Sequence, residues 1–357
     1  MEIKGKEGQK KKLLRNLAIA ILSSFSIVAV ILIFSKGEKT LVRISEFPLY
    51  EIVLDFAIFL IVFLIDSIRT MVIAHFLGEK VSWNVALNNS VLGYFFTYIT
   101  PFSAGGQPYQ IYHLSKWGMN VENSSAIILT RWSNMLIFLS VSSLFLMKKY
   151  LPFVQFGIPL VSRVLGIVII LSVAFSLAMV VFFLVPNVGI GVIKWLQRLK
   201  LVKLAFRLFK KDAVEVLDEF SEKMKNFYDS MRIIWAKKPW LVIFDGFMGI
   251  IDLFVLYYIL YRSIEISSVT STPFELSFWN LSAIYILMSF IVYYVPTPGS
   301  SGGVEGGLYA VLAPHGNTSA IMTGILMWRF TTYYLPILFG FVFMIFETRR
   351  NPKSASS

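Results

Sequence analysis

The string Thr-Pro-x-x-x-Gly-Gly occurs twice in this chain, at residues 100–106 and 297–303, and both copies lie inside apolar sequence. Proline removes a backbone donor, and paired glycines adopt conformations closed to other residues, so each copy is expected to break a helix. Backbone groups freed in hydrocarbon must be satisfied by protein or by a water-filled cavity. Matching breaks in the two halves of a membrane protein therefore predict a site near the middle of the membrane. The residues expected to form the breaks are Pro101, Gly105, Gly106, Pro298, Gly302 and Gly303.

Composition places the chain among all-α, polytopic integral membrane proteins. Hydrophobic residues make up 56% of the sequence and charged residues only 15%, whereas a soluble domain carries about 25% charged residues. Stretches long enough to cross a bilayer recur, and they predict about six spanning helices near residues 14–35, 49–75, 123–147, 162–186, 240–262 and 318–346. Two further segments, 85–99 and 276–296, bring the apolar segments to eight. Each runs into a break, and short helices are expected after the breaks at 107–116 and 304–314.

The distribution of basic residues predicts the orientation. Lys and Arg concentrate in the tail 1–13, in the loop 187–239, which has twelve of them against six acids, and in the tail 347–357. Because cytoplasmic segments carry the basic excess, we expect these three on the cytoplasmic side of the cytoplasmic (inner) membrane, with both termini inside. Residues 263–276 contain no Lys or Arg and are expected outside.

This orientation leaves each membrane half with one apolar segment too many, because an even number of crossings must connect two cytoplasmic segments. The parity is restored if 85–116 and 276–314 are re-entrant hairpins that enter from opposite sides. The halves 14–186 and 240–346 would then form an inverted repeat, as in many transporters. The alternative that 276–296 spans fully stays open, because this segment is long enough.

Other features narrow the partners. Residues 194–211 alternate apolar and basic positions at helical spacing, which indicates an amphipathic helix on anionic lipid headgroups. We attribute the net charge of +12 to such contacts and expect no direct nucleic-acid partner. The chain has no cysteine, and its three histidines lack metal-ligand spacing. Since no nucleotide loop, catalytic triad or carboxylate pair is visible, we expect no cofactor, no metal and no catalytic residue. A homo-oligomer stays open.

Arg131 and Arg329 are the leading candidates for substrate binding. They follow the second glycine of their strings by 25 and 26 residues, near the middle of the next helix. A charge there costs roughly 2.5–3.5 kcal/mol on insertion scales, so it is expected to face a cavity or a partner. A guanidinium presents a planar fork that fits a phosphate. The alternative role is a structural ion pair.

Further polar residues complete the predicted site. Asp66 and Arg69 stand three apart on one helix, and they either neutralise each other or contact substrate. Glu305 is expected to complement a helix dipole, to pair with an arginine or to bind a cationic headgroup. The membrane acids whose partners the sequence does not assign are Asp55, Asp245 and Asp252. The predicted substrate-binding set is Arg131, Arg329, Gln107, Glu305, Asp66 and Arg69.

The glycine pairs are expected to act through backbone geometry. We predict positive φ in each pair, and a clash with the facing hairpin when a side chain is added. Gly340 is expected to be an ordinary glycine of a spanning helix.

Three segments resemble one known family. They are residues 101–110 (PFSAGGQPYQ), the next helix with Thr130-Arg131, and residues 296–306 (PTPGSSGGVEG). They are similar to the lysylphosphatidylglycerol synthase transmembrane, or flippase-like, family, and the similarity covers about residues 12–346. In that family, the multiple peptide resistance factor joins this membrane region to a soluble domain that transfers lysine from lysyl-tRNA to phosphatidylglycerol. The chain ends eleven residues after its last predicted helix, so we expect a stand-alone form without the transferase domain.

The resemblance implies a flippase or transporter that moves a phospholipid, such as aminoacylated phosphatidylglycerol or another lipid with an anionic phosphate, across the cytoplasmic membrane. It also implies a link to lipid metabolism and antibiotic resistance. One alternative is phosphatidylglycerol lysyltransferase-type lipid modification with a separate soluble catalytic partner, which is also the enzyme label the family would give. A second alternative is a small-solute or ion transporter.

Overall fold

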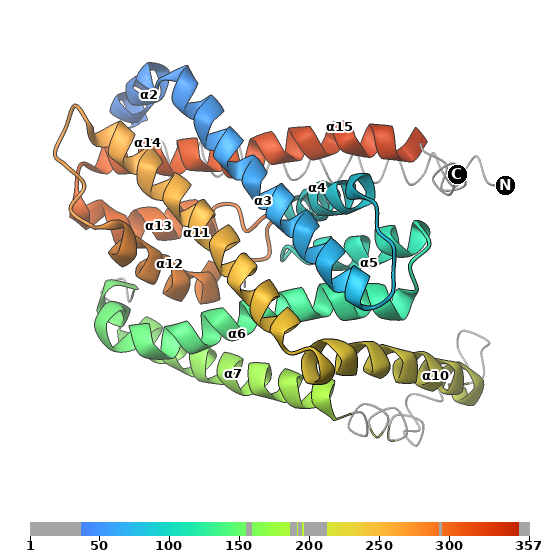
Figure 1. Ribbon diagram of the computed structural model, residues 1–357. Helices are drawn as coiled ribbons and strands as arrows, with labels where there is room; N and C mark the ends of the chain where they lie inside the picture. Colours follow the sequence, from blue (N-terminus) through green and yellow to red (C-terminus); the bar gives the residue numbers. More distant parts are fainter. Residues whose placement is uncertain are drawn as a thin grey trace.

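The computed structural model describes residues 37–154, 159–185, 191, 195, 213–292 and 295–349, and the regular elements of this part are helices (Figure 1). The first half contains α2 (Gly37–Glu46), α3 (Leu49–Phe76), α4 (Trp83–Ile99), α5 (Gly106–Lys116), α6 (Val121–Val154) and α7 (Pro159–Leu184). The second half contains α10 (Ala213–Arg232), η1 (Ile233–Lys237), α11 (Trp240–Ser268), α12 (Phe278–Val292), α13 (Gly303–Leu312), η2 (Ala313–His315), α14 (Thr318–Arg329), η3 (Phe330–Tyr334) and α15 (Leu335–Arg349). Two of these, η1 and η3, are π-helices, and η2 is a 3-10 helix.

Local sequence signals explain where several helices begin. Proline fixes φ at a helical value and needs no amide partner, and Pro48 and Pro239 directly precede α3 and α11. The Asn317 side chain accepts hydrogen bonds from two backbone amides in the first turn of α14, each with a length of 3.1 Å. The starts predicted at residues 49, 240 and 318 therefore coincide with the observed ones.

Among the described residues, four helices are long and apolar enough to cross a membrane, namely Val121–Val154, Arg163–Leu184, Trp240–Ser268 and Thr318–Thr348. α2 and α3 give a fifth candidate if they count as one span, although their axes meet at 77°. These five coincide with five of the six predicted spanning segments. The sixth, 14–35, lies outside the described residues, as do the tail 1–13 and nearly all of the amphipathic segment 194–211. The chain is thus an all-α, multi-pass integral membrane protein.

Both broken segments turn back on themselves. The Asn89 side-chain amide donates to the Gln110 carbonyl over 2.8 Å, so α5 runs back along α4. A Cβ built on Gly307 of α13 would lie 2.6 Å from Cε of Met288, which places α13 beside α12. The short helices begin at Gly106 and Gly303, the second glycine of each string. The expected chain reversals are present, while the membrane side from which each hairpin enters stays a prediction.

The two hairpins lie at opposite ends of the long helices (Figure 1). The start of α6 meets α5 through Ser115 and Ser124 (3.4 Å), whereas its end meets α12 through Tyr150 and Asn280 (2.7 Å). The last helices pass the hairpins in the reverse order, because α14 lies beside α13 and α15 lies beside α4. The hairpins therefore approach each other from opposite ends, which supports the predicted inverted repeat.

Within the described part of the predicted cytoplasmic loop, the longest helix is α10, which continues into η1. Its Phe227 ring lies 6.4 Å from the ring of Phe183 on α7, and its Met231 sulfur lies 3.6 Å from the hydroxyl of Thr130 on α6. Phe227 and Met231 are both buried. α10 thus packs directly onto two membrane helices.

Candidate functional site

The two Thr-Pro-x-x-x-Gly-Gly strings fold into the same pair of turns. In residues 100–104, the Thr and Pro carbonyls each accept from the amide three residues later, over 3.2 and 3.3 Å. In residues 297–301, the same two hydrogen bonds measure 3.0 and 3.1 Å. The repeat in the sequence is therefore also a repeat in backbone structure.

Left-handed backbone conformations repeat at equivalent positions. Phe102 and Ser103 have φ of 56° and 54°, and their equivalents at 299–300 have φ of 55° and 53°. This conformation costs a residue other than glycine roughly 1–2 kcal/mol, and such strain gathers at functional sites. Gly302 has the predicted positive φ of 86°, but Gly105 has φ of −84°, so the prediction is wrong for the first pair. The left-handed residues common to both turns lie earlier than the glycine pairs.

Close packing is what requires the second glycine of each pair. A Cβ built on Gly106 would overlap the Thr97 hydroxyl, and one built on Gly303 would overlap the Val295 side chain. Both obstacles lie just before the break in the same hairpin, not in the facing hairpin as predicted. The first turn of each short helix can therefore approach the preceding segment only without a side chain.

The two breaks touch each other. Pro101 and Pro298 form an isolated antiparallel bridge. These prolines occupy the same position in the two strings, and antiparallel pairing of equivalent residues places a local two-fold axis between them. The Tyr333 hydroxyl lies 3.2 Å from the Pro298 carbonyl and 3.3 Å from the Tyr98 carbonyl, so it contacts both hairpins. The meeting point is the centre of the predicted inverted repeat.

Exposure breaks this local symmetry. Phe102 is 55% exposed, whereas Ser300 and Ser301 of the second break are 3% and 1% exposed. Gln107, just after the first break, is half-buried. The first break is thus exposed, whereas the second break is buried.

Glu305 and Arg329 form a buried ion pair beside the second break. Arg329 donates through Nε to Glu305 Oε1 and through Nη2 to the Gly299 carbonyl, both over 2.8 Å. Glu305 Oε2 accepts from the Gly302 amide over 2.6 Å at the start of α13. Two roles considered for Glu305 are therefore combined, because it caps a helix and pairs with an arginine.

A second group of buried charges, which we call the charge cluster, lies between α3, α6 and α11. Arg131 pairs through Nη2 with Asp66 Oδ1 and donates through Nη1 to the Thr70 hydroxyl over 2.8 Å. All side chains of this cluster are at least nine-tenths buried. Its members are Asp66, Arg69, Arg131, Asp245 and Asp252.

Arg69 connects the two acids of α11. Its Nε and Nη2 donate to Asp245 over 2.8 and 3.1 Å, and its Nη1 donates to Asp252 over 3.2 Å. Gly249 makes room, since a Cβ there would lie 3.0 Å from Arg69 Nη2. Arg69 and Asp66 come no closer than 3.8 Å, so each has a nearer partner on another helix. The sequence allowed Asp66 and Arg69 to neutralise each other, but in the structure their mutual contact is a minor one.

A row of aromatic side chains leads from α3 to Arg329. The ring of Tyr94 on α4 lies 5.5 Å from that of Phe63 on α3 and 5.9 Å from that of Tyr98. The Tyr98 and Tyr333 rings are 5.0 Å apart, and the Arg329 guanidinium lies 4.6 Å from the Tyr333 ring centroid. Arg131 and Arg329 belong to separate ion-pair groups. Their binding of a phosphate stays a prediction.

Two further charged groups lie toward the helix ends. Arg262 donates to Asp55 over 2.8 Å and pairs with Glu51, which supplies the partner that the sequence did not assign to Asp55. At the other end of the molecule, Glu347 accepts from Asn88 over 3.0 Å and from Trp117 over 2.7 Å. This second group ties the first hairpin to α15.

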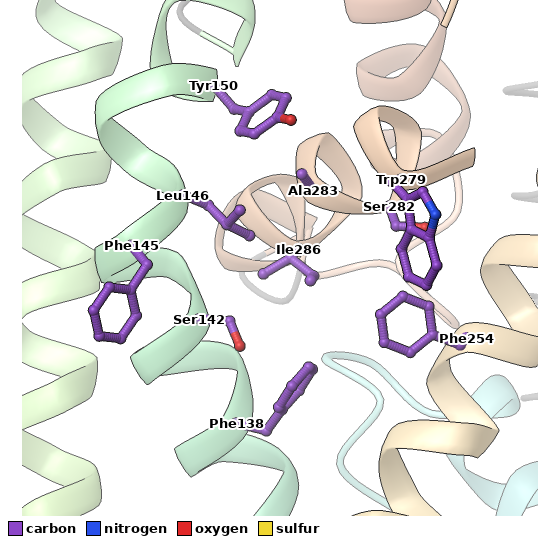
Figure 2. Close-up of a pocket in the computed structure, with 10 residues that line it drawn as sticks. All are labelled: Phe138, Ser142, Phe145, Leu146, Tyr150, Phe254, Trp279, Ser282, Ala283 and Ile286. Carbon is purple, nitrogen blue, oxygen red and sulfur yellow. The ribbon is translucent and has the colours of Figure 1, made fainter. Parts of the chain in front are cut away.

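An open apolar groove of about 430 Å³ lies between α6, α11 and α12 (Figure 2). Figure 2 shows the α6 side chains on one wall and those of α12 and α11 on the other, with Tyr150 at one end. Ser142 and Ser282 are the small polar groups in this lining. The other lining side chains are Phe138, Phe145, Leu146, Tyr150, Phe254, Trp279, Ala283 and Ile286.

Comparison with known proteins identifies the family. The model of the lysylphosphatidylglycerol synthase TM region matches residues 17–340. The chain belongs to this family. It is 25% identical over 329 residues to a UPF0104 membrane protein of Archaeoglobus fulgidus, covering 90% of this chain and 94% of that protein. It is 23% identical over 352 residues to a UPF0104 membrane protein of Methanocaldococcus jannaschii, covering 96% of this chain and 98% of that protein.

The sequence did not single out Tyr333, the residue whose hydroxyl contacts both hairpins. Tyr333 follows Arg329 by four positions, so the two share one face of a helix, and that spacing was the available signal. The partners of Asp245 and Asp252 carried no such signal, because Arg69 lies more than 170 residues away in the chain.

Proposed function

We propose that this protein moves a phospholipid across the cytoplasmic membrane. The observation that carries the proposal is an open apolar groove beside a buried arginine-containing charge cluster. Asn134, which donates to Asp245 at 2.7 Å, stands one helical turn before Phe138 of the groove lining, so both lie on the same face of α6. A phospholipid presents the same combination, a charged headgroup joined to apolar chains.

The arginines would take the lipid phosphate by exchanging partners. Arg131 and Arg329 are each engaged by a carboxylate, and carboxylate and phosphate accept the same guanidinium fork. A phosphate that replaces Asp66 or Glu305 would therefore keep the arginine paired at every step. Gln107 and the backbone amides at the start of α5 would complete the headgroup contacts.

Alternating exposure would follow from the local two-fold axis. Movement of one hairpin against the other would bury the first break, which is now exposed, and expose the second break, which is now buried. The family supports a lipid with an anionic phosphate as substrate, and aminoacylated phosphatidylglycerol is the proposed natural lipid.

The test uses purified protein in vesicles of phosphatidylcholine and phosphatidylglycerol in a three-to-one ratio, with a trace of fluorescent phosphatidylglycerol. Dithionite added outside quenches only the outer leaflet, so the quenched fraction reports lipid movement. Wild-type protein should raise this fraction without tRNA or a soluble partner. If it does not, the proposed function is wrong for this lipid.

Variants of the ion pair separate binding from folding. Arg329→Gln leaves Glu305 buried without its partner and should destabilise the fold by about 3–5 kcal/mol. Glu305→Gln/Arg329→Gln removes both charges together, so no buried charge is left unpaired and thermal unfolding should return toward wild type while lipid movement stays lost. Normal lipid movement by the folded double variant would contradict the role of Arg329.

A further inference from the structure

In the charge cluster, acidic side chains outnumber basic ones. Three aspartates, Asp66, Asp245 and Asp252, lie against two arginines, Arg69 and Arg131. If all five are ionised, one negative charge is uncompensated in the interior of the helix bundle. An isolated carboxylate in an apolar interior is strongly unfavourable, and such a group becomes neutral by taking a proton.

The unused oxygen atoms show where protons fit. Asp245 has both oxygens engaged, Oδ1 by Arg69 and Oδ2 by Arg69 and Asn134. Within the described residues, Oδ1 of Asp252 and Oδ2 of Asp66 are buried and have no hydrogen-bond partner. A carboxylate accepts hydrogen bonds only, whereas its protonated form donates one from the spare oxygen. Asp252 and Asp66 are therefore the two positions that can hold a proton.

The surroundings favour a proton over a metal ion. In the part of the chain that the structure describes, no group of three acids or histidines converges as metal ligands. The charged groups around Asp252 are Arg69 on α3, Arg131 on α6 and Asp245 on α11.

We propose that the charge cluster is a proton-binding site that couples lipid movement to proton movement. Asp252 holds one proton at Oδ1 while Arg131 stays paired with Asp66. When a lipid phosphate draws Arg131 away, Asp66 loses its partner and takes a second proton from the aqueous phase at Oδ2. An O–H bond forms and no electron is transferred, and release of the lipid reverses the step. The resident proton on Asp252 is independent of the proposed function, whereas the coupled proton on Asp66 rests on it.

Asp252 is a better place for the resident proton than Asp66. Its bond to Arg69 measures 3.2 Å, and Arg69 also carries the two shorter bonds to Asp245. Asp66 has the direct pairing with Arg131, which favours its ionised form. The cluster is then neutral with one proton and the two arginines in place.

Infrared spectroscopy tests the resident proton without any transport. The wild-type protein near neutral pH should show the C=O band of a buried protonated carboxyl, and Asp252→Asn should remove that band. Asp55→Asn, the same substitution on α3 in the separate pair with Arg262, should leave it. If the wild-type spectrum contains no such band, or if the band persists in Asp252→Asn, then Asp252 does not hold the resident proton.

A pH gradient across the vesicles described above tests the coupled proton. If lipid and proton move together, labelled phosphatidylglycerol should accumulate in the leaflet that faces the more alkaline solution. Asp66→Asn keeps an acceptor for Arg131 but cannot gain a proton, so its lipid distribution should not respond to the gradient, whereas Asp55→Asn should respond as wild type does.

The outcomes separate the two proposals. Wild-type lipid movement that ignores the pH gradient, or that follows a sodium gradient instead, overturns the coupling and leaves the lipid function standing. Absence of lipid movement in every condition overturns the lipid function and the coupled proton with it, while the infrared band still decides the resident proton.

Discussion

At the scale of single residues, buried charges in this protein are defined by their partners. Arg131 and Arg329 were singled out because a charge near the middle of a membrane is costly, and each is paired with a carboxylate from another helix or from the break itself. Removing one partner of a buried pair leaves the other uncompensated. Loss of activity after a single substitution therefore does not distinguish binding from folding, which is why the double variant of Glu305 and Arg329 is needed.

The glycines give a prediction at the same scale. Gly303→Ala should lower stability by about 1–3 kcal/mol, because its Cβ would overlap the Val295 side chain. Gly306→Ala is the matched control, since it lies in the same helix and a Cβ there meets no atom within 4 Å. Thermal unfolding in detergent should show a lower midpoint for Gly303→Ala and an unchanged or higher midpoint for Gly306→Ala.

Equal midpoints for these two variants would show that close packing does not require Gly303. Gly340 is not the ordinary glycine of a spanning helix that the sequence predicted, so it cannot serve as a control. A Cβ on Gly340 would lie 2.6 Å from the Cβ of Phe95, so this glycine also sits at a tight helix contact, between α15 and α4.

At the scale of elements, the sequence predicted what local chemistry decides. Proline and glycine gave the breaks and the starts of the short helices at Gly106 and Gly303, and apolar length gave the long helices. It did not predict α2, whose apolar Leu41 and Val42 are exposed and whose mean hydropathy is low. Nor did it predict the π-helix η3, which follows Arg329 within one apolar segment and carries Tyr333 to the breaks. These features depend on contacts with distant residues.

The meeting of the breaks can be tested by a cross-link. Residues paired in an antiparallel bridge have Cα atoms about 4.5–5.5 Å apart, which suits a disulfide with its range of about 4.4–6.8 Å. Pro101→Cys/Pro298→Cys should therefore form an intramolecular disulfide on mild oxidation, in a chain that has no native cysteine. Mass spectrometry after thiol alkylation should find no free thiol in the double variant and one in each single variant.

Free thiols that persist in the double variant would mean that the two breaks do not meet in the membrane. If the disulfide forms and the proposed function holds, it should also stop lipid movement, and reduction should restore it, because the hairpins could no longer move against each other.

At the scale of the whole molecule, the two hairpins share a backbone symmetry that their charged residues do not follow. Equivalent turns, equivalent left-handed residues and the pairing of Pro101 with Pro298 point to two halves related by a local two-fold axis. The charges do not follow this symmetry. Glu305 of the second hairpin has Pro108 as its equivalent in the first, and Arg131 finds its acid on α3 instead. A symmetric framework with asymmetric charges suits a protein whose two hairpins exchange roles around one site.

The inverted arrangement predicts that the outer ends of the hairpins face opposite sides of the membrane. Asn120 lies just after the first hairpin and Ser277 just before the second, and both are exposed. Each is replaced singly by cysteine in the cysteine-free chain, and an impermeant thiol reagent is added outside intact cells. Because the basic loop and tails are expected in the cytoplasm, Ser277→Cys should be labelled and Asn120→Cys should be spared until the cells are opened. Labelling of both positions from outside would place both hairpins on one side and exclude the inverted repeat, whatever the local symmetry of the breaks.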